Sequence, residues 1–255
     1  MTEAYLFNLI IGVSVGIGLA VFVTLFFYPA PYGRHARKGW GPQIDNRLGW
    51  ILMESVSPIG FFVLFMVGAW KTGLMPYVFL GLWLAHYLYR SFLFPALMRG
   101  NKRMPVLIVL FAILFNVMNS YLQGRYLFHF SPQVSQYATE WLVSAPFLIG
   151  VVLFAAGFVI HVTSDTITRN LRRAGETGYR IPHGGLFRWI SCPNYFGEIV
   201  EWTGWAILTW SIPGLVFAFW TAANLLPRAH SNHKWYRSRF AEYPSERRAI
   251  IPFLF

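Results

Sequence analysis

The sequence has few charged residues and almost no cysteine. Only 12% of its residues are charged, against about 25% in an average globular protein, so a large solvated surface is not expected. The single cysteine, Cys192, excludes an internal disulfide and any zinc or iron–sulfur site built on several cysteines. The seven histidines form no HExxH pair, and we expect no metal site.

A nucleotide-binding fingerprint of the Rossmann type is also missing. The stretch GVSVGIGLA, residues 12–20, has spaced glycines, but the third glycine of the fingerprint is absent and no strand precedes it. Small residues at such spacing are typical of helix packing in membranes. Any nucleotide must therefore be bound by helices and loops.

Apolar residues dominate instead: 56% of the chain is hydrophobic and 19% is aromatic. About 20 consecutive apolar residues suffice to cross a bilayer, and the sequence contains a series of such candidates. They predict an all-α, polytopic membrane protein, a seven-helix transmembrane bundle forming a single domain over residues 1–255. The first span is too long for a cleavable signal peptide. The expected spans are Ala4–Tyr28, Trp50–Trp70, Leu74–Leu97, Met104–Leu122, Ala145–Ser164, Tyr195–Trp210 and Ile212–His233.

The 21 lysines and arginines are distributed unevenly over the loops between these spans. One side holds the basic residues of the loops after spans one, three and five and of the C-terminal tail. The other side has only Lys71 and Arg125, and Arg90 lies within a span. The positive-inside rule then predicts an external N-terminus and a cytoplasmic C-terminus. The positive-inside rule thereby accounts for the net charge of +11. No nucleic-acid partner is expected.

Ionisable groups inside the front spans are candidates for a functional site, because charge within a bilayer is costly. Glu54 lies one turn into the second span, with no neutralising neighbour in the sequence. Tyr87 lies in the middle of the third span, with Arg90 three residues further along the same face. Taken alone, Tyr87 also fits an interfacial anchor. A polar face on the fourth span fits a site or ordinary interhelical hydrogen bonds; it consists of Asn116, Asn119, Ser120 and Gln123.

Three polar stripes lie near the expected cytoplasmic ends of the last three spans. Spacings of three or four residues place the members of a stripe on one helix face. Cations there can bind phosphates, while Glu and Asn can hold a neutral polar group, so we predict a polyanionic, amide-bearing cofactor. For the first stripe a surface ion-pair network is the alternative, and for the Gly-rich loop an ordinary connection. The stripes are Asp165, Arg169 and Arg172; Asn194, Glu198 and Glu201; and Arg228, Asn232 and Tyr236; the loop adds Tyr179 and Arg180.

The motifs of the chain resemble those of the steroid 5α-reductase family. In the C-terminal third the resemblance runs through the SD pair, YRIP, GGLF, NYFGE, the following EW, TWS and the ending YPSERRAIIPF. In the front half it is looser and rests on PYGRH, on W-x-x-x-E and on HY-x-x-R-x-F. The short N-Y-x-G-E element by itself also occurs in sterol reductases and in isoprenylcysteine carboxyl methyltransferases.

The resemblance implies reduction of the 4,5 double bond of 3-oxo-Δ4 steroids with NADPH. It implies that Glu54 and Tyr87 flank the C3 carbonyl of the steroid, in a substrate pocket that also includes Trp50 and Arg90. Residues 1–122 would serve mainly the steroid, and residues 145–255 mainly the cofactor. His161 departs from the family pattern, which has an asparagine there, and Ser231-Asn232 replaces part of a His-rich run. The implied NADPH site consists of Asp165, Arg172, Tyr179, Arg180, Asn194, Glu198, Arg228, Asn232 and Tyr236, with Glu201 beside it as the partner of a nearby arginine.

The chemistry of enone reduction defines what the front spans must supply. Hydride addition to C5 places negative charge on the C3 oxygen, which a hydrogen-bond donor must stabilise. Tyr87, assisted by a Glu54 kept neutral through burial, supplies that donor. An apolar steroid is expected to enter from the membrane lipid, either of a bacterial inner membrane or of the endoplasmic reticulum. A reductase of trans-enoyl or polyprenol lipids, a prenylcysteine-type methyltransferase and a transporter are the alternatives.

Overall fold

The computed structural model describes residues 2–100, 102–131, 137–172, 176 and 178–255. The chain forms two compact units. Unit 1 comprises Met1–Ile11 and Pro31–Phe147, and unit 2 comprises Gly12–Ala30 and Leu148–Phe255. The first helix, α1 (Glu3–Phe27), contributes residues to both.

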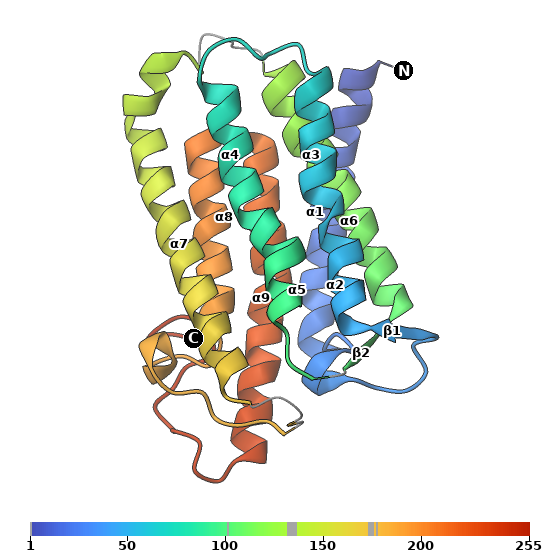
Figure 1. Cartoon of the computed structure of the whole chain (residues 1–255), viewed down its shortest axis with the longest axis vertical. Coiled ribbons are helices and arrows are strands. Elements are labelled where there is room, and N and C mark those ends of the chain that lie inside the picture. Colours follow the sequence, from blue (N-terminus) through green and yellow to red (C-terminus); the bar gives the residue numbers. More distant parts are fainter. Residues whose placement is uncertain (1, 101, 132–136, 173–175, 177) are drawn as a thin grey trace. The chain divides into compact units, whose positions relative to one another are not determined.

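Helices α2 to α6 make up unit 1 (Figure 1), and α6 packs against α2 and α3. The expected second span begins earlier than predicted and is interrupted at Ser55. Two segments are π-helical: Tyr89–Leu93 lies within the expected third span, and Tyr126–Phe130 lies beyond Leu122, the expected end of the fourth. The first joins α4 to α5 and the second extends α6. The helices are α2 (Asn46–Glu54), α3 (Val56–Val67), α4 (Met75–Leu88), α5 (Phe94–Leu97) and α6 (Val106–Arg125).

Unit 1 also contains a small antiparallel sheet that the all-α prediction omitted. Strand β1 (Gln43–Asp45) pairs with β2 (Arg103–Pro105) in register Ile44 to Met104. Asp45 then ends the strand and caps α2, because its Oδ1 accepts from the backbone nitrogens of Arg47 and Leu48 at 2.9 and 3.1 Å. Strands of three residues are too short to show an alternating pattern, so they could not be predicted from the sequence.

Unit 2 is built on α7 (Ala145–Asn170), apart from its start up to Phe147, and on α8 (Pro193–Thr209) and α9 (Ile212–Arg239). The three helices run alongside one another in Figure 1. Glycines let the backbones of α7 and α8 approach closely. A Cβ at Gly197 would lie 2.6 Å from the backbone nitrogen of His161, and one at Gly157 would collide with that of Glu201. Such contacts between small residues are the usual means of packing helices where both are surrounded by apolar material.

The C-terminal tail of unit 2 is tied to the segment that precedes α8. Ile190 and Arg248 form a parallel bridge, in which Ser191 N donates to Arg248 O and Arg248 N donates to Trp189 O, both at 2.9 Å. Cys192 N donates to Ala249 O at 3.1 Å. The tail is therefore part of the framework that positions the start of α8.

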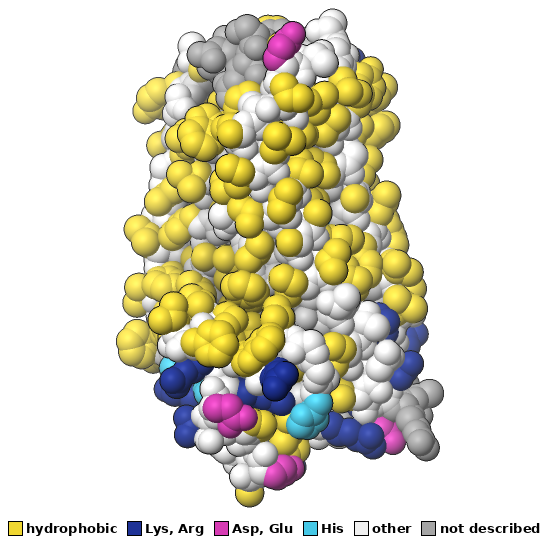
Figure 2. Space-filling model, turned by 90° about the vertical axis from the view of Figure 1, so that its left-hand side faces the viewer, with side chains coloured by type: hydrophobic (Ala, Val, Ile, Leu, Met, Phe, Trp, Pro, Cys, Tyr) yellow, Lys and Arg dark blue, Asp and Glu magenta, His cyan; other side chains and the backbone are white. Residues whose placement is uncertain are grey.

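Four helical stretches are long and apolar enough to cross a membrane: Glu3–Phe27, Asn46–Val67, Val106–Phe130 and Ala145–Asn170. Hydrophobic side chains cover most of the face seen in Figure 2, and Lys and Arg side chains gather at one end of it. The helical architecture of an integral membrane protein is thus confirmed. The other three expected spans are helical, as α4 to α5, α8 and α9. Their crossing of the membrane and the orientation of the termini remain predictions.

Candidate active site

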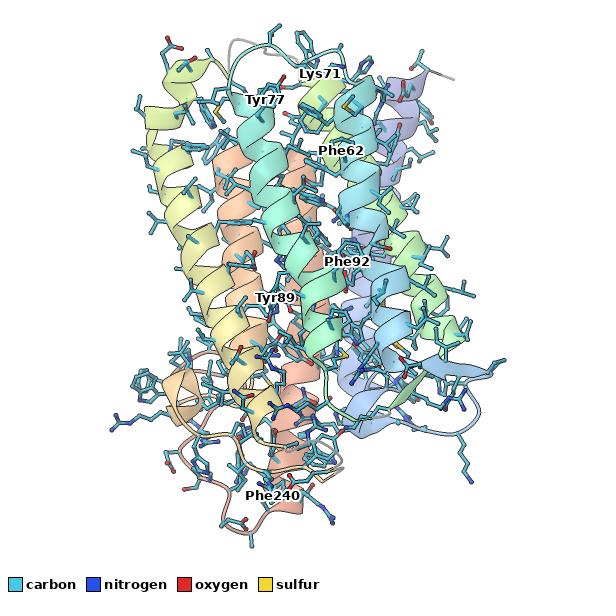
Figure 3. The ribbon with its side chains drawn as sticks, viewed as in Figure 1. Phe62, Lys71, Tyr77, Tyr89, Phe92 and Phe240 are labelled. Carbon is cyan, nitrogen blue, oxygen red and sulfur yellow. The ribbon has the colours of Figure 1, made fainter. Side chains whose placement is uncertain are left out.

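Glu54 and Arg90 form an ion pair in the interior of unit 1. Arg90 Nε lies 3.8 Å from Glu54 Oε1, and the two side chains are 13% and 15% exposed. Glu54 ends α2, while Arg90 belongs to the π-helical segment in which Figure 3 labels Tyr89 and Phe92. Arg90 is the second residue of this segment, so the ion pair joins the end of α2 to the π-helical turn between α4 and α5. The sequence suggested no neutralising partner for Glu54, and the fold supplies one.

Aromatic rings enclose the guanidinium of Arg90. Its Cζ lies 4.3 Å from the centre of the Trp50 ring and 5.0 Å from that of Phe94. The two rings meet edge to face at 5.3 Å. Cation–π contacts are stronger when desolvated, about 2 kcal/mol or more. The structure therefore brings Trp50, Glu54 and Arg90 together, as the resemblance implied.

Tyr87 lies in the aromatic core of unit 1 and is only 3% exposed. Its ring centre is 4.9 Å from that of Trp83, which in turn stacks on Phe61 at 4.5 Å. Burial of this kind argues against the alternative of an interfacial anchor, which would keep its hydroxyl at the membrane surface.

The polar face of α6 mainly joins helices to one another. Asn116 donates from Nδ2 to Met53 O at 2.6 Å and accepts from Ser57 Oγ at 3.0 Å. Ser120 Oγ donates to Ser57 O at 3.4 Å. The interhelical interpretation is therefore confirmed for Asn116 and Ser120.

A cluster of carboxylates surrounds His161 in unit 2. The imidazole is completely buried; its Nε2 lies 3.1 Å from Asp165 Oδ2 and 3.3 Å from Glu198 Oε1, and its Nδ1 lies 3.8 Å from Glu201 Oε2. Asn194 Nδ2 donates to the other oxygen of Asp165 at 3.0 Å. Asp165, Asn194 and Glu198 are thus brought together as expected. The ion-pair partner described for Glu201 is a histidine, whereas an arginine was predicted.

Arg228 is held by a tyrosine that the residue spacing did not predict. Its Nη2 donates to Tyr195 Oη and its Nη1 to Asn224 Oδ1, both at 3.2 Å. Asn232 Nδ2 approaches the same phenol oxygen at 3.5 Å. Tyr195 therefore connects α8 to two predicted cofactor residues on α9. Its place directly after Asn194 was the one available signal.

The remaining predicted cofactor residues have different surroundings. Arg172 Cζ lies 5.8 Å from the Tyr179 ring, which packs against Trp235 at 4.9 Å. Arg180 is largely exposed and pairs with Glu176 at 3.0 Å. Tyr236 is 3% exposed and stacks on Tyr243, with ring centres 5.2 Å apart. The phenol of Tyr236 thus lies within aromatic packing near the end of α9, which Phe240 marks in Figure 3.

Arg247 is a buried cation that the sequence analysis also missed. It is 3% exposed, its Cζ lies 5.2 Å from the Tyr243 ring, and its Nη2 lies 3.4 Å from His183 Nδ1. Within the described parts of the chain, its Nε and Nη1 have no hydrogen-bond partner. A buried guanidinium with unsatisfied N–H groups is costly, so this position would be stabilised by an anion. That requirement fits a phosphate-bearing cofactor.

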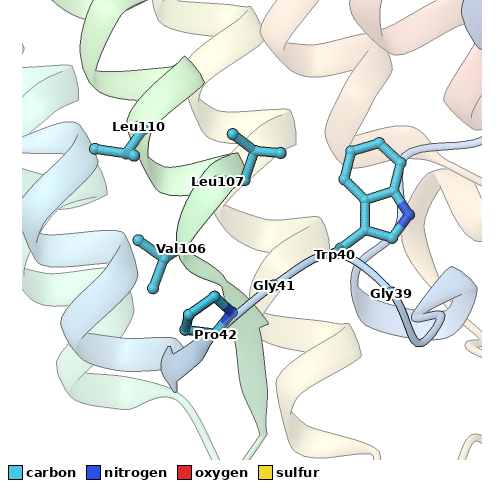
Figure 4. A pocket seen from close by; sticks show the side chains of 7 residues that line it. All are labelled: Gly39, Trp40, Gly41, Pro42, Val106, Leu107 and Leu110. Carbon is cyan, nitrogen blue, oxygen red and sulfur yellow. The ribbon is translucent and has the colours of Figure 1, made fainter.

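A separate apolar groove of about 490 Å³ lies in unit 1 (Figure 4). The loop Gly39–Pro42 forms one side, and Val106, Leu107 and Leu110 of α6 form the other. None of its lining residues carries an ionisable side chain, and a ligand site normally has a few polar groups that fix orientation. The candidate chemistry therefore belongs to the polar clusters.

An α-helical integral membrane protein with buried polar clusters is the class that these features define. Residues 102–255 match the sequence model of the family described as 3-oxo-5-alpha-steroid 4-dehydrogenase. The chain belongs to this family.

Similar curated proteins align with nearly the whole chain. It is 41% identical to a steroid 5-alpha-reductase (DET2) of Gossypium hirsutum over 94% of this chain and 93% of the relative. It is 40% identical to 3-oxo-5-alpha-steroid 4-dehydrogenase 1 of Bos taurus, over 100% of this chain and 99% of the relative. It is 42% identical to the protein of the same name of Homo sapiens, over 94% of this chain and 92% of the relative. The resemblance found in the motifs is confirmed, and neither a methyltransferase nor a transporter is supported.

Proposed function

We propose that this protein reduces the 4,5 double bond of 3-oxo-Δ4 steroids to 5α-dihydro steroids, with NADPH as the reductant. The observation that carries the proposal is an identity of 40–42% over nearly the full length of proteins named for this activity. The buried polar residues of both units support it, because each unit offers groups suited to one of the two reactants.

Unit 2 has the donors and acceptors that NADPH would need. Cations suited to its phosphates are Arg172, Arg180 and Arg228, together with the unsatisfied N–H groups of Arg247. Asp165, Asn194 and Glu198 could bind a carboxamide and ribose hydroxyls, which are neutral groups with donors of their own. We also assign Tyr179, Asn232 and Tyr236 to this site, the last after a rearrangement of its stacking. When bound, NADPH supplies the hydride that C5 accepts.

Unit 1 has the groups that would act on the steroid carbonyl. The hydroxyl of Tyr87 donates a hydrogen bond to the C3 oxygen and stabilises the charge that develops there. The guanidinium of Arg90 stabilises the carboxylate form of Glu54, so the neutral acid expected from the sequence is not the form that this ion pair favours. We therefore propose that Glu54 orients the groups around the carbonyl, in a pocket that Trp50 lines. A proton from solvent completes the reaction at C4.

The proposal includes an orientation in the membrane. The cofactor is a water-soluble polyanion and would enter from the cytoplasmic side, where the positive-inside rule puts most of the basic residues. The steroid would enter from the lipid. Seven spans, an external N-terminus and a cytoplasmic C-terminus satisfy both conditions, in a bacterial inner membrane or in the endoplasmic reticulum.

The experiment is NADPH oxidation by the purified protein in lipid nanodiscs with testosterone, progesterone or a long-chain trans-enoyl lipid. Oxidation with a steroid, and recovery of its 5α-dihydro product, is the expected result. Oxidation with the enoyl lipid alone would keep a reductase but overturn the substrate class. No oxidation with any of them, by protein that is folded, would overturn the reductase itself.

A further inference from the structure

His161 is the centre of the polar cluster in unit 2. It is 0% exposed, and three carboxylates from α7 and α8 lie within 4 Å of its ring nitrogens: Asp165, Glu198 and Glu201. The resemblance places an asparagine at this position, so the family pattern assigns no role to a histidine here.

Both ring nitrogens of His161 face carboxylate oxygens. Nε2 is directed to Asp165 and Glu198, and Nδ1 to Glu201. A neutral imidazole has one N–H and one lone pair, so one of its nitrogens would direct a lone pair at a carboxylate. An imidazolium has two N–H groups; its Nε2 is within hydrogen-bond distance of Asp165, and its charge lies within ion-pair distance of Glu201 on the other side. The geometry therefore favours a cation at the centre of the cluster.

The packing of α7 against α8 holds this cation in place. Gly197 lies so close to the backbone of His161 that a Cβ there would come within 2.6 Å of His161 N. The backbone of His161 is therefore held close to α8, the helix that carries Glu198 and Glu201. Asp165 in turn accepts from Asn194 Nδ2 at 3.0 Å, so the position of His161 is transmitted to an amide.

We propose that His161 is a positioning residue for the polar end of the cofactor. As an imidazolium it holds the carboxylates of Asp165 and Glu198 and, through Asp165, the amide of Asn194. Glu201 lies on the opposite side of the ring and adds a second negative charge that stabilises the imidazolium. An asparagine could not do the same, because both of its N–H donors are on one nitrogen. The inference rests on the proposed function, since Asp165, Asn194 and Glu198 are taken as cofactor-binding residues.

The test compares His161→Gln, Glu201→Gln and the double variant in nanodiscs. His161→Gln is expected to lower kcat on the order of 10- to 100-fold, as a displaced reacting group does. It should change the KM for NADPH much less, because the arginines that bind phosphates are untouched. Removing the charge of Glu201 as well should recover about tenfold in kcat, since the two residues are coupled.

The same three variants are compared by thermal unfolding, and His230→Gln serves as the matched control. His230 lies on α9 and stacks on Phe255, so this variant should retain the kcat of the wild type. His161→Gln should lower the Tm, and the double variant should regain part of the loss. If wild-type protein shows no NADPH-dependent reduction, the proposed function fails. The Tm values of the single and double variants then still test whether the charge of His161 stabilises Glu201.

Three results would overturn the proposal. The first is an unchanged kcat for His161→Gln, which would remove the positioning role. The second is a lower Tm with normal kcat in the folded fraction, which would leave only a structural role. The third is a double variant no better than His161→Gln in kcat and Tm, which would show that ring size rather than charge matters.

Discussion

The two units of this protein stabilise buried charge in different ways. In unit 1 one carboxylate, Glu54, meets one guanidinium, Arg90, against the ring of Trp50. In unit 2 several carboxylates converge on His161, and arginines rest on tyrosine rings or donate to tyrosine and amide oxygens. An ion pair packed against aromatic rings leaves a mostly apolar environment, whereas a network of carboxylates and arginines leaves many donors and acceptors. The first suits a lipid with one carbonyl, and the second suits a polar cofactor.

The largest expected effect is on the chemistry assigned to unit 1. Tyr87→Phe should lower turnover about 10²- to 10³-fold, because a donor to the developing oxyanion is lost. Glu54→Gln should also lose most turnover. NADPH affinity, measured by titration, should stay near that of the wild type in both. Tyr77→Phe, on the same helix but 52% exposed, is the control and should be fully active. Near-normal turnover of both variants would contradict the division of roles between the units.

The two units also differ in what lies next to the glycines at their helix contacts. Gly157→Ala should destabilise by about 1–3 kcal/mol, because the new methyl group meets the immovable backbone of Glu201. Gly49→Ala in unit 1 meets the sulfur of Met104, the outer part of a flexible side chain that can rotate away, and should cost less. Gly16→Ala has open space and is the control. Thermal unfolding in nanodiscs measures all three. Equal losses for Gly157→Ala and Gly49→Ala would show that the contact with backbone costs no more than a contact with a movable side chain.

A smaller effect is expected for the cations of unit 2. Arg172→Ala should weaken NADPH binding roughly tenfold and NADH binding less, because a charged hydrogen bond to the 2′-phosphate is lost. Arg239→Ala, at the exposed end of α9, should change neither. Binding constants for the two nucleotides decide the matter. An equal loss for NADPH and NADH would exclude Arg172 from phosphate recognition.

The smallest effect concerns the cap that joins the sheet of unit 1 to α2. Asp45→Ala removes an acceptor of two backbone N–H groups and should lower stability by about 1 kcal/mol. Asp45→Asn keeps the capping oxygen and should be nearly neutral. Turnover per folded molecule should not change in either variant. A loss of turnover with Asp45→Asn would indicate that this end of unit 1 has a direct part in the reaction.

Residue spacing predicted which residues belong to the polar cluster of unit 2 better than which of them contact one another. The spacing of Asn194 and Glu198 placed them on one face of a helix, and the structure brings both to Asp165 or His161. The choice of histidine as the partner of Glu201 could not be predicted, because it depends on the register of α7 against α8. That register is set where Gly157 and Gly197 allow the two backbones to touch.

In unit 1 the sequence was informative about residue types and less so about geometry. Glu54, Tyr87 and Trp50 were selected as polar or aromatic groups in apolar spans, and Arg90 as a neighbour of Tyr87. The ion pair joins Arg90, in a π-helical segment, to Glu54 at the end of another helix, and neither the π-helical turn nor the packing of the two helices leaves a reliable mark in the sequence. The short sheet was missed for a similar reason, since three residues show no period.

The sequence by itself determined that this chain is helical, belongs in a membrane and carries the motifs of its family. These properties follow from composition and from a local period of 3.6 residues, which each helix expresses independently. Only the tertiary structure decided which carboxylate meets which cation. Pairing across helices depends on backbone approach and helix register, and these are set by contacts between residues far apart in the chain. His161, with carboxylates at both ring nitrogens, is the clearest case.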